Sequence, residues 1–506
     1  MNKLFSLFYI SLTALGLLVA NTVVASDTQD YVADLDYLYR MGKEVYCYWD
    51  NKREMYGVDW DVLYKRAGQK MQKAKSPQES YGILREMVSA VKDGHVNIWM
   101  DSPELLLPYY MPLKFTDVGG KVIVSRVKES AFWGVPPVQP GDEILAIDGK
   151  KIGERMAFLS HYCSGSTPRM VRRCALAWLN SLMPFESLPD RNPLLLLRKA
   201  GTGKTIQTEV PWLIYESAQD PTFKEEAWSI QEDVEAKIFP GNIGYLRVGA
   251  MADRDPERRD SRRLINYIEN LFPKLLKTKG LIIDVRGNGG GSGSTGDAIL
   301  SHLIDKPTIR YKASPRLSMV TLFQRPSFFE YEPDPAEQGR FSKWKEIIIE
   351  PASANLRYHG KVVVLIDSRC FSACDTFADS VASNGLAVMM GEPTGGGTGY
   401  PLGFFLPSGM NVRFSTLRGM SNFGHLLEGI GTVPQISARL SVEDITEERD
   451  SVLMRAHALL LSGTHLGKSF ETGGFTPAIP LRGEPIEPAF VTEKALISAT
   501  AREGED

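Results

Sequence analysis

Ser372 is the residue best placed for nucleophilic chemistry, because the sequence predicts that a strand turns into a helix there. The apolar run Lys361–Ile366 is typical of a buried strand, and apolar residues recur at helical spacing over 377–382. Such a turn exposes a hydroxyl, and the unpaired N–H groups of the first helical turn, beginning at Ala373, point toward the group that it attacks. The competing interpretation is that Ser372 only caps the helix.

Two further segments could complete such a site. His95 follows a predicted helix that stops at a glycine and precedes a short alternating strand, so its imidazole should lie at a turn. A neutral imidazole can take the proton of a serine hydroxyl and return it to a leaving amine. Gly289 and Gly290 follow the predicted strand 280–286, and their N–H groups could bind a developing oxyanion together with that of Ala373. Alternatively, His95 only makes a local hydrogen bond and the glycines only form a tight loop.

Composition limits the classes of function that need consideration. The chain has 506 residues, enough for several domains, and its formal net charge of −3 gives no electrostatic support for a nucleic-acid partner. Of the five cysteines, Cys163 and Cys174 are the best candidates for a disulfide, and the odd number leaves at least one thiol free or paired elsewhere. No Cys/His spacing typical of zinc is present, so neither a metal nor another cofactor is expected.

The first 25 residues read as a secretory signal peptide. Met1-Asn2-Lys3 precede an apolar run over 4–20, and Val23-Val24-Ala25 suits a signal peptidase. The alternative is a retained membrane anchor. No later stretch is long and apolar enough to span a bilayer. The sequence thus predicts an exported protein, periplasmic or extracellular, that is soluble and not stably inserted in a membrane after cleavage.

The remaining chain divides into four predicted segments. Residues 26–100 read as a helical domain, 105–215 as a β-rich domain, 225–465 as a larger α/β unit, and 466–506 as a tail rich in Pro and Gly. Within the β-rich segment, Pro140-Gly141-Asp142 precedes a strand and an Asp-Gly hairpin turn. This stretch resembles a PDZ domain, a fold that binds extended peptides by strand addition, with a helical insertion over 153–190.

Five motifs together resemble the tail-specific (C-terminal processing) and tricorn-type serine peptidase family, over about residues 30–461. They occur in the family's order at residues 93–95, 140–142, 284–291, 370–375 and 428–434. The resemblance implies an α/β fold with a crotonase-like core of ββα units, beside the N-terminal helical domain and the PDZ-like domain. It also implies that Ser372 is the nucleophile.

The family activates its serine in two ways, and the sequence distinguishes them. One branch uses a lysine about 25 residues after the serine, and Gly397 occupies that position here, which rules out a Ser/Lys dyad there. The tricorn-like branch uses a histidine after the N-terminal helices and a glutamate before a Gly-x-x-Pro stretch, and His95 and Glu428 fit these places. Tricorn has a serine before its histidine, where this chain has Gly94. The rival bases are His425 and, less favourably placed, His359.

The predicted function is an exported serine endopeptidase that acts on polypeptides, engaged through their C-terminal ends by a PDZ-like domain that recruits or gates them. Ser372 would be the nucleophile, His95 the base and Glu428 its support. Activity should fall as the pH drops through 6–7, where an unperturbed imidazole gains its proton. The competing hypotheses are a catalytically inactive peptide- or ligand-binding relative, which should have lost a member of this set, and a scaffold protein. The sequence gives no indication of oligomeric state, natural substrate or cleavage preference.

Overall fold

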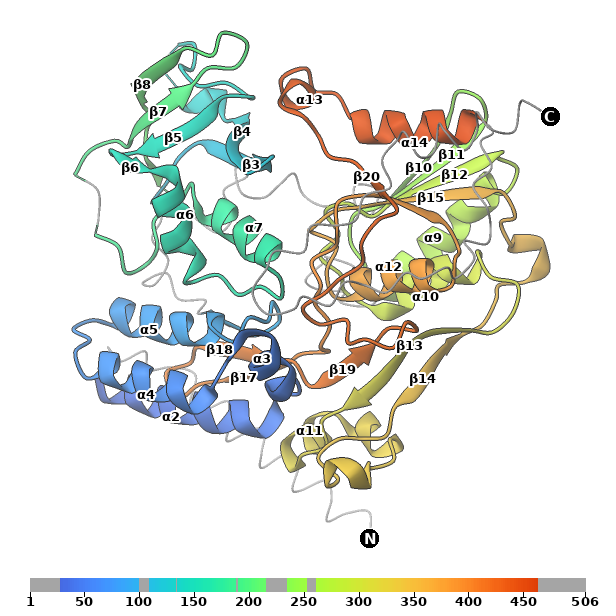
Figure 1. Cartoon of the computed structure of the whole chain (residues 1–506), viewed down its shortest axis with the longest axis horizontal. Coiled ribbons are helices and arrows are strands. Elements are labelled where there is room, and N and C mark those ends of the chain that lie inside the picture. The colour runs from blue at the N-terminus through green and yellow to red at the C-terminus, as the bar shows by residue number, and fades with distance from the viewer. Residues whose placement is uncertain are drawn as a thin grey trace, which may run out of the picture.

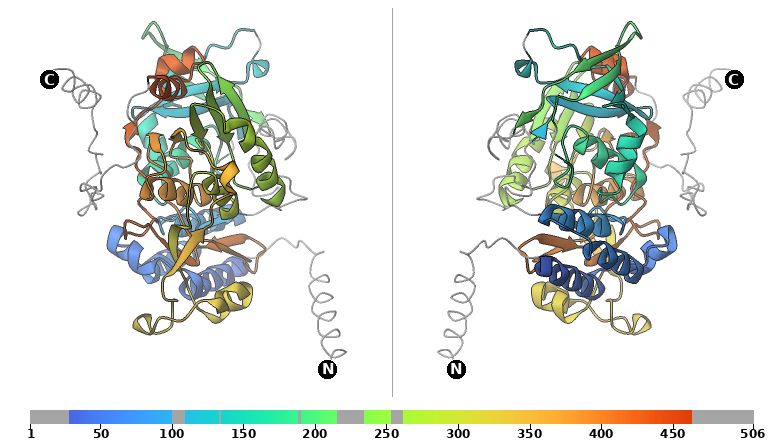
Figure 2. Two further views of the ribbon diagram at one scale, coloured as in Figure 1. Left: turned by 90° about the vertical axis from the view of Figure 1, so that its right-hand side faces the viewer. Right: turned by 90° about the vertical axis from the view of Figure 1, so that its left-hand side faces the viewer.

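The computed structural model describes residues 28–99, 109–132, 134–187, 190–214, 234–252 and 261–462 (Figure 1). The predicted signal peptide (1–25) and the predicted tail (466–506) lie outside these residues. Within them, a helical unit, a β-rich module and an α/β core lie around a common centre, as the side views also show (Figure 2).

The helical unit is built from four amphipathic helices and closed by strands from much later in the chain. Asp59 and Ser76 cap two of the helices through their side chains. The buried faces of the helices share one core with a three-stranded sheet of order β1-β18-β17, so residues near position 95 are held between the helices and β18. The elements are α2 (Thr28–Val45), α3 (Trp49–Tyr56), α4 (Trp60–Met71), α5 (Pro77–Ser89), β1 (Asn97–Trp99), β17 (Leu402–Phe405) and β18 (Asn411–Phe414).

The β-rich module is a sheet of order β3-β4-β5-β7-β8, with β6 paired to β5 and two helices packed on one face. Thr167 and Pro168 start the second helix, as N-cap and first helical residue. Cys163 and Cys174 form the expected disulfide between the helices. The elements are β3 (Leu113–Val118), β4 (Lys121–Val127), β5 (Glu143–Ile147), β6 (Lys150–Lys151), α6 (Ile152–Ser160), α7 (Pro168–Trp178), β7 (Leu194–Arg198), β8 (Thr205–Glu209), and a separate pair of β2 (Tyr109–Tyr110) with β9 (Leu213–Ile214).

The α/β core contains a sheet of order β10-β11-β12-β15-β16-β20, parallel except for β10. Helices α9, α10 and α12 cover one face and α14 covers the other (Figure 1). The loops that follow β12, β15 and β16 leave from one edge of the sheet because these neighbouring strands are parallel. The elements are β10 (Val234–Phe239), β11 (Ile243–Val248), α9 (Ser261–Leu275), β12 (Gly280–Asp284), α10 (Gly293–Ser301), β15 (Lys361–Ile366), α12 (Ala373–Ser383), β16 (Val388–Gly391), β20 (Ile436–Ser437) and α14 (Ser451–Leu461).

A smaller sheet of order β14-β13-β19 extends from the core beside the helical unit (Figure 1). Residues between β13 and β14 form α11 and short 3₁₀ turns, which pack into a small core around Phe328. The elements are β13 (Thr308–Pro315), α11 (Met319–Gln324), η3 (Pro326–Glu330), η4 (Pro335–Glu337), β14 (Lys345–Ile349), η5 (Ala354–Leu356) and β19 (Leu417–Met420).

The apolar residues over 443–461 recur at a spacing that predicts one closing helix, and this prediction was wrong. The segment forms α13 (Val442–Thr446) and then α14, separated by Glu448, whose backbone has a positive φ of 52°. Ser441 and Asp444 form a capping box that starts α13, and Asp450 accepts the Leu453 N–H and so starts α14 separately. Local capping therefore overrides the apolar periodicity that spans the break.

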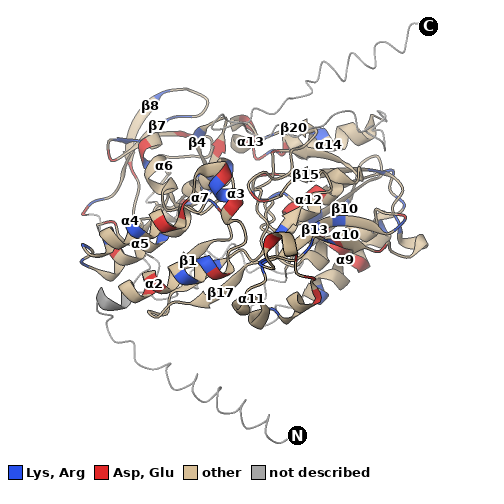
Figure 3. Ribbon diagram, turned by 60° about the horizontal axis from the view of Figure 1, so that its bottom comes forward, with Lys and Arg blue, Asp and Glu red and all other residues tan. Residues whose placement is uncertain are grey.

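Lys and Arg are interspersed with Asp and Glu over the visible elements (Figure 3), as expected for a chain whose net charge is close to zero. Among the helices that the structure describes, none combines the length and the apolar character that a transmembrane span requires.

Candidate active site

Ser372 lies in the turn between β15 and α12, with a backbone conformation (φ 59°, ψ −118°) that is strained for a residue with a side chain. Its N–H donates to Gly397 O at 2.9 Å. Its hydroxyl makes no capping hydrogen bond to the helix that follows, so the structure does not support the N-cap interpretation. A disulfide between Cys370 and Cys374, which their spacing in the sequence did not predict, brackets this turn. The turn therefore directs the hydroxyl away from the helix.

The histidine predicted to act as base lies against this hydroxyl. His95 Nε2 is 3.0 Å from Ser372 Oγ, although the two residues come from the helical unit and from the core. The backbone of His95 is fixed on both sides: its N–H donates to Asp93 Oδ1 at 2.7 Å and its carbonyl accepts Arg413 Nε at 3.0 Å. Burial lowers the pKa of His95 to about 4, so the imidazole is neutral and able to accept a proton at neutral pH.

Phe371 lies beside both glycines at which the chain departs from the family's pattern. The Phe371 ring packs on the His95 ring, with 4.5 Å between centroids. A Cβ at Gly397 would come within 1.7 Å of this ring, and a Cβ at Gly94 would lie 2.5 Å from Met170 and 2.8 Å from the Phe371 ring. A lysine at the first position or a serine at the second would therefore clash with Phe371 unless the ring moved.

The two predicted oxyanion-hole glycines differ in what their N–H groups contact. Gly290 N–H donates to Asn288 Oδ1 at 2.8 Å, and a Cβ at Gly290 would lie 2.8 Å from Ser372 Cβ. Gly290 thus brings the glycine loop against the serine but has its own donor engaged. No described residue accepts a hydrogen bond from the N–H of Gly289 or of Ala373. These two groups are the free donors beside Ser372.

Glu428 is fully buried and approaches His95 without a hydrogen bond to it. One of its oxygens accepts Lys52 Nζ at 2.7 Å and the other accepts Thr398 N at 2.9 Å. Lys52 is itself completely buried. Burial raises the pKa of Glu428, repulsion from Asp93 raises it further, and the Lys52 ammonium opposes both effects. The structure therefore places Glu428 near the pair but gives it a lysine as its partner.

Three residues of the site carried no predicted role. Asp93 is buried beside His95, Lys52 neutralises Glu428, and Asp375 accepts the N–H groups of Gly396 and Gly397. Asp375 thereby holds the loop whose carbonyl binds the Ser372 N–H. Its proximity to Ser372 in the sequence was a usable signal, whereas nothing in the α3 sequence distinguishes Lys52 from a surface lysine.

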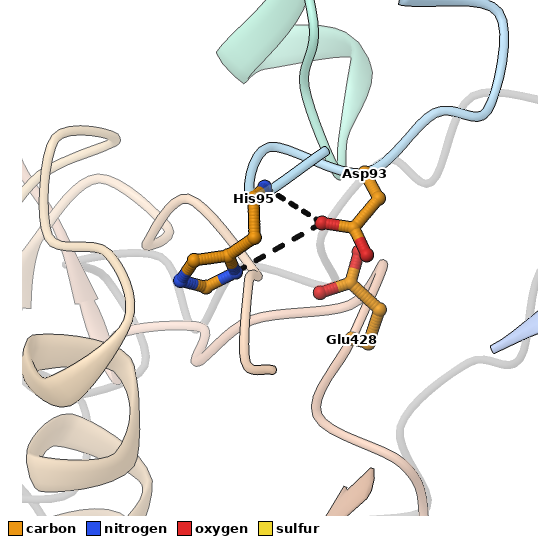
Figure 4. A group of neighbouring side chains, drawn as sticks. All are labelled: Asp93, His95 and Glu428. Atoms are coloured by element: carbon orange, nitrogen blue, oxygen red, sulfur yellow. Dashed lines mark hydrogen bonds and ion pairs between the residues drawn. The ribbon is translucent and has the colours of Figure 1, made fainter. Parts of the chain in front are cut away.

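Asp93, His95 and Glu428 could in principle hold a cation, since their ligand atoms lie within 4.8 Å of one another (Figure 4). Both Glu428 oxygens and both Asp93 oxygens already accept hydrogen bonds, in part from the Lys52 ammonium. The donor set is therefore used by the protein's own groups, and the arrangement favours proton transfer.

Neither rival base contacts Ser372. His359 is largely exposed and lies 3.9 Å from an Asp305 oxygen. His425 stacks against Phe423 in the loop after β19. In the part of the chain that the structure describes, His95 is the histidine hydrogen-bonded to Ser372.

Comparison with known proteins identifies the core. Residues 242–438 match the family model described as Peptidase family S41. This core is a serine-peptidase domain of that family. The match confirms the resemblance to the tail-specific peptidases and the predicted enzyme class, a serine-type peptidase. It includes Ser372, both predicted oxyanion-hole glycines and Glu428, whereas His95 lies outside it.

Solved structures extend the likeness beyond the family domain. Mature CPAF complexed with lactacystin has a TM-score of 0.68 at 17% identity, and the alignment covers 87% of this chain and 98% of that chain. Mature CPAF alone gives the same TM-score and identity over 86% and 97%. A putative peptidase from Parabacteroides merdae is 20% identical, with a TM-score of 0.47 over 86% and 97%. The chain thus shares the fold of mature CPAF along most of its length.

Proposed function

We propose that this serine peptidase cleaves polypeptides with Ser372 as nucleophile and His95 as general base. The observation that carries the proposal is the distance of 3.0 Å between His95 Nε2 and Ser372 Oγ, at the N-terminus of α12. A hydrogen bond of this length lets the neutral imidazole take the hydroxyl proton as the oxygen attacks.

The reaction uses groups that already point at one another. Ser372 Oγ bonds to the carbonyl carbon, its proton passes to His95 Nε2, and the π electron pair of the carbonyl moves onto its oxygen. The free N–H groups of Ala373 and Gly289 stabilise that oxyanion. The imidazolium then gives its proton to the departing amine, which leaves an acyl-enzyme that water hydrolyses by the reverse sequence. Glu428 supports the site from a distance by fixing Lys52 and the Thr398 backbone.

The pH range over which the peptidase should be active follows from the burial of His95. It differs from the range that the sequence suggested. With the pKa of His95 at about 4, the base stays neutral through pH 6–7 and gains its proton only in more acidic solution. We expect acylation to be constant from pH 7 to 5 and to fall through pH 4, rather than through 6–7.

The substrate and location are inferred from other parts of the chain. The β-rich module presents β3 and β8 as the two ends of its sheet, and an extended peptide could add to such an edge. We propose that it engages the C-terminal ends of polypeptide substrates, with the module either recruiting or gating them. The sequence of residues 1–25 and the two disulfides support export to a periplasmic or extracellular compartment. N-terminal sequencing of the secreted protein should begin at Ser26.

Labelling with a fluorophosphonate tests the nucleophile directly. The full chain should be labelled at Ser372 at pH 7, Ser372→Ala should not be labelled, and His95→Ala should react at least about 10²-fold more slowly. A folded, unlabelled wild-type protein would exclude the peptidase mechanism and favour the inactive peptide-binding relative.

A further inference from the structure

The carboxylate nearest to the His95 ring belongs to Asp93 rather than to Glu428 (Figure 4). Asp93 Oδ1 lies 3.9 Å from His95 Nδ1 and accepts the His95 N–H. Figure 4 marks two contacts to His95 from Asp93 and none from Glu428, although the ligand atoms of all three residues lie within 4.8 Å of one another. His95 Nδ1 is buried and has no hydrogen-bond partner among the described residues. A small closing of the 3.9 Å gap would therefore pair it with Asp93.

The carboxylate of Glu428 is already paired with the Lys52 ammonium. Lys52 Nζ lies 2.7 Å from Glu428, and both side chains are completely inaccessible to solvent. Because Lys52 Nζ lies in direct contact with the Glu428 carboxylate, the glutamate brings no uncompensated negative charge to the imidazole. A buried ion pair of this kind acts as a neutral unit toward its neighbours at short range.

The Asp93 carboxylate, in contrast, has no Lys or Arg in hydrogen-bond contact among the residues that the structure describes. Its oxygens accept the Tyr46 hydroxyl at 3.0 Å, the Ser415 hydroxyl at 2.8 Å and the His95 N–H at 2.7 Å, all neutral donors. Burial raises the pKa of the Tyr46 hydroxyl well above its usual value, so it stays protonated and continues to donate. Neutral donors stabilise an ionised carboxylate and leave its charge free to act on His95.

We propose that Asp93 is the residue that orients His95 and balances the charge of its imidazolium, and that Lys52 confines Glu428 to a structural role beside it. The inference rests on the proposed function, since it concerns how the His95 of that mechanism is supported. Asp93 is a positioning residue: it acts through His95 and does not contact the substrate.

The charged groups around His95 give opposite effects on its protonation. Asp93 favours the imidazolium, whereas Arg413, from β18, and Lys52, from α3, disfavour it; Glu428 faces the ring paired with Lys52. Removing Asp93 should therefore move the acid limb of the rate profile to lower pH. Removing Lys52 should move it to higher pH.

The first experiment compares Asp93→Asn with a matched loss of another buried carboxyl. Asp379→Asn is the control, because Asp379 is buried in α12 and bonded to Ser421 rather than to His95. With fluorophosphonate as the probe, Asp93→Asn should label about 10²–10⁴-fold more slowly at pH 7, because the amide favours the wrong imidazole tautomer. Turnover of an unfolded polypeptide should show the loss in kcat with KM little changed. Asp379→Asn should label within threefold of wild type.

The second experiment removes the ion pair as a unit. Lys52→Met with Glu428→Gln replaces both charges by neutral groups of similar size and leaves no buried charge unpaired. This double variant should lose only about tenfold in labelling rate, and its acid limb should stay near that of wild type, because the pair is neutral as a unit toward His95. A measurement on the unaltered chain needs no variant: ¹⁵N-labelled histidine should show the proton of His95 on Nδ1 at pH 7.

The outcomes separate this inference from the proposed function. If wild type is labelled and Asp93→Asn is labelled at the same rate as Asp379→Asn, the role of Asp93 is overturned. The peptidase mechanism then remains intact. A folded Lys52→Met/Glu428→Gln protein as slow as His95→Ala would assign the role to Glu428 instead. A His95 proton on Nε2 would contradict the inference even if neither variant folds. No labelling of folded wild type would remove the proposed function itself.

Discussion

Phe371 links the packing of the site to the protonation state of His95. Its ring lies on the His95 ring and fills the space beside Gly94 and Gly397. The main cause of the lowered pKa of His95 is burial, and an aromatic ring on the imidazole face excludes water from it. One side chain thus accounts both for the missing lysine and for a base that stays neutral in mildly acidic solution.

Truncating Phe371 should therefore change the pH profile. Phe371→Ala admits water to His95, so the pKa of the imidazole should rise toward 6.5 and the acid limb of labelling should move from about pH 4 to higher pH. Rates of fluorophosphonate labelling between pH 3.5 and 8 measure this shift.

Phe377→Ala provides the control for that variant. Phe377 is buried in α12 on the side of the sheet core, and both truncations should lower the free energy of unfolding by about 3–5 kcal/mol. Only Phe371→Ala should move the acid limb of the labelling profile. Equal profiles for the two variants would show that Phe371 does not set the protonation of His95.

The residues of the site differ in how far the sequence could reveal them. Ser372 could be predicted because a strand-to-helix turn is a local pattern. Lys52 could not, because a lysine in a short helix is usually solvated and only the fold brings it to Glu428. Asp93 was visible within a motif, but its orientation toward His95 depends on Tyr46 and Ser415, which are distant in the chain.

At the scale of elements, the turn from β15 into α12 carries the proposed nucleophile and is braced from several sides. The Cys370–Cys374 disulfide closes it, Asp375 binds the neighbouring loop, and Gly397 O holds the Ser372 N–H. Such bracing suits a residue whose φ of 59° an unsupported chain would rarely adopt.

Removing this disulfide should affect rate more than stability. Cys370→Ala/Cys374→Ala opens a loop of only four residues' separation, which should lower the free energy of unfolding by about 2 kcal/mol on the loop-entropy account. Because a small misplacement of the nucleophile lowers the reaction rate strongly, labelling of Ser372 should slow by about 10–100-fold.

The module disulfide is the matched comparison. Cys163→Ala/Cys174→Ala opens a longer loop, with a separation of 11 residues, and should lower stability by about 3 kcal/mol. Its labelling rate, measured well below the melting temperature, should stay within threefold of wild type. A reversed order of the two effects on rate would refute the bracing role of Cys370–Cys374.

The elements of the core also differ in how well the sequence predicts them. The strand predicted at 361–366 was found as β15, because a continuous apolar run is typical of a buried strand. The segment 262–275 has one apolar face at helical spacing, which predicts the helix found as α9. The pairing of Cys370 with Cys374 did not follow from their spacing, and the break before α14 depends on caps that compete with periodicity.

At the scale of the whole molecule, the site exists only where separate units meet (Figure 1). The helical unit supplies His95 and Lys52, the core supplies Ser372, and the residue Ser166 of the β-rich module accepts the Gly94 N–H at 3.0 Å. The order of motifs along the sequence indicated these participants through a family resemblance. The contacts that join the units lie between residues from 72 to 376 positions apart, so no local sequence pattern indicates them.

The module is anchored on the catalytic loops by one side of α7. Arg169 donates to the carbonyls of Thr394 and Ile430, each at 2.6 Å, and Thr167 donates to Gly395 O at 2.9 Å. These carbonyls belong to the loops that hold Ser372 and Glu428, so the position of the module is coupled to the geometry of the site. Arg172, one turn along the same helix, instead pairs with Asp117 inside the module.

Arg169→Ala should therefore loosen the catalytic loops, whereas Arg172→Ala should not. We expect Arg169→Ala to slow Ser372 labelling by about tenfold or more and to speed hydrogen exchange over residues 394–397 and 428–431, because three buried carbonyl contacts lose their donor or its support. Arg172→Ala removes an equal charge from α7 and should leave both measurements near wild type. If the two variants show the same hydrogen exchange and the same Ser372 labelling rate, docking of the module does not influence the site. Gating by the module would then have to act through other contacts.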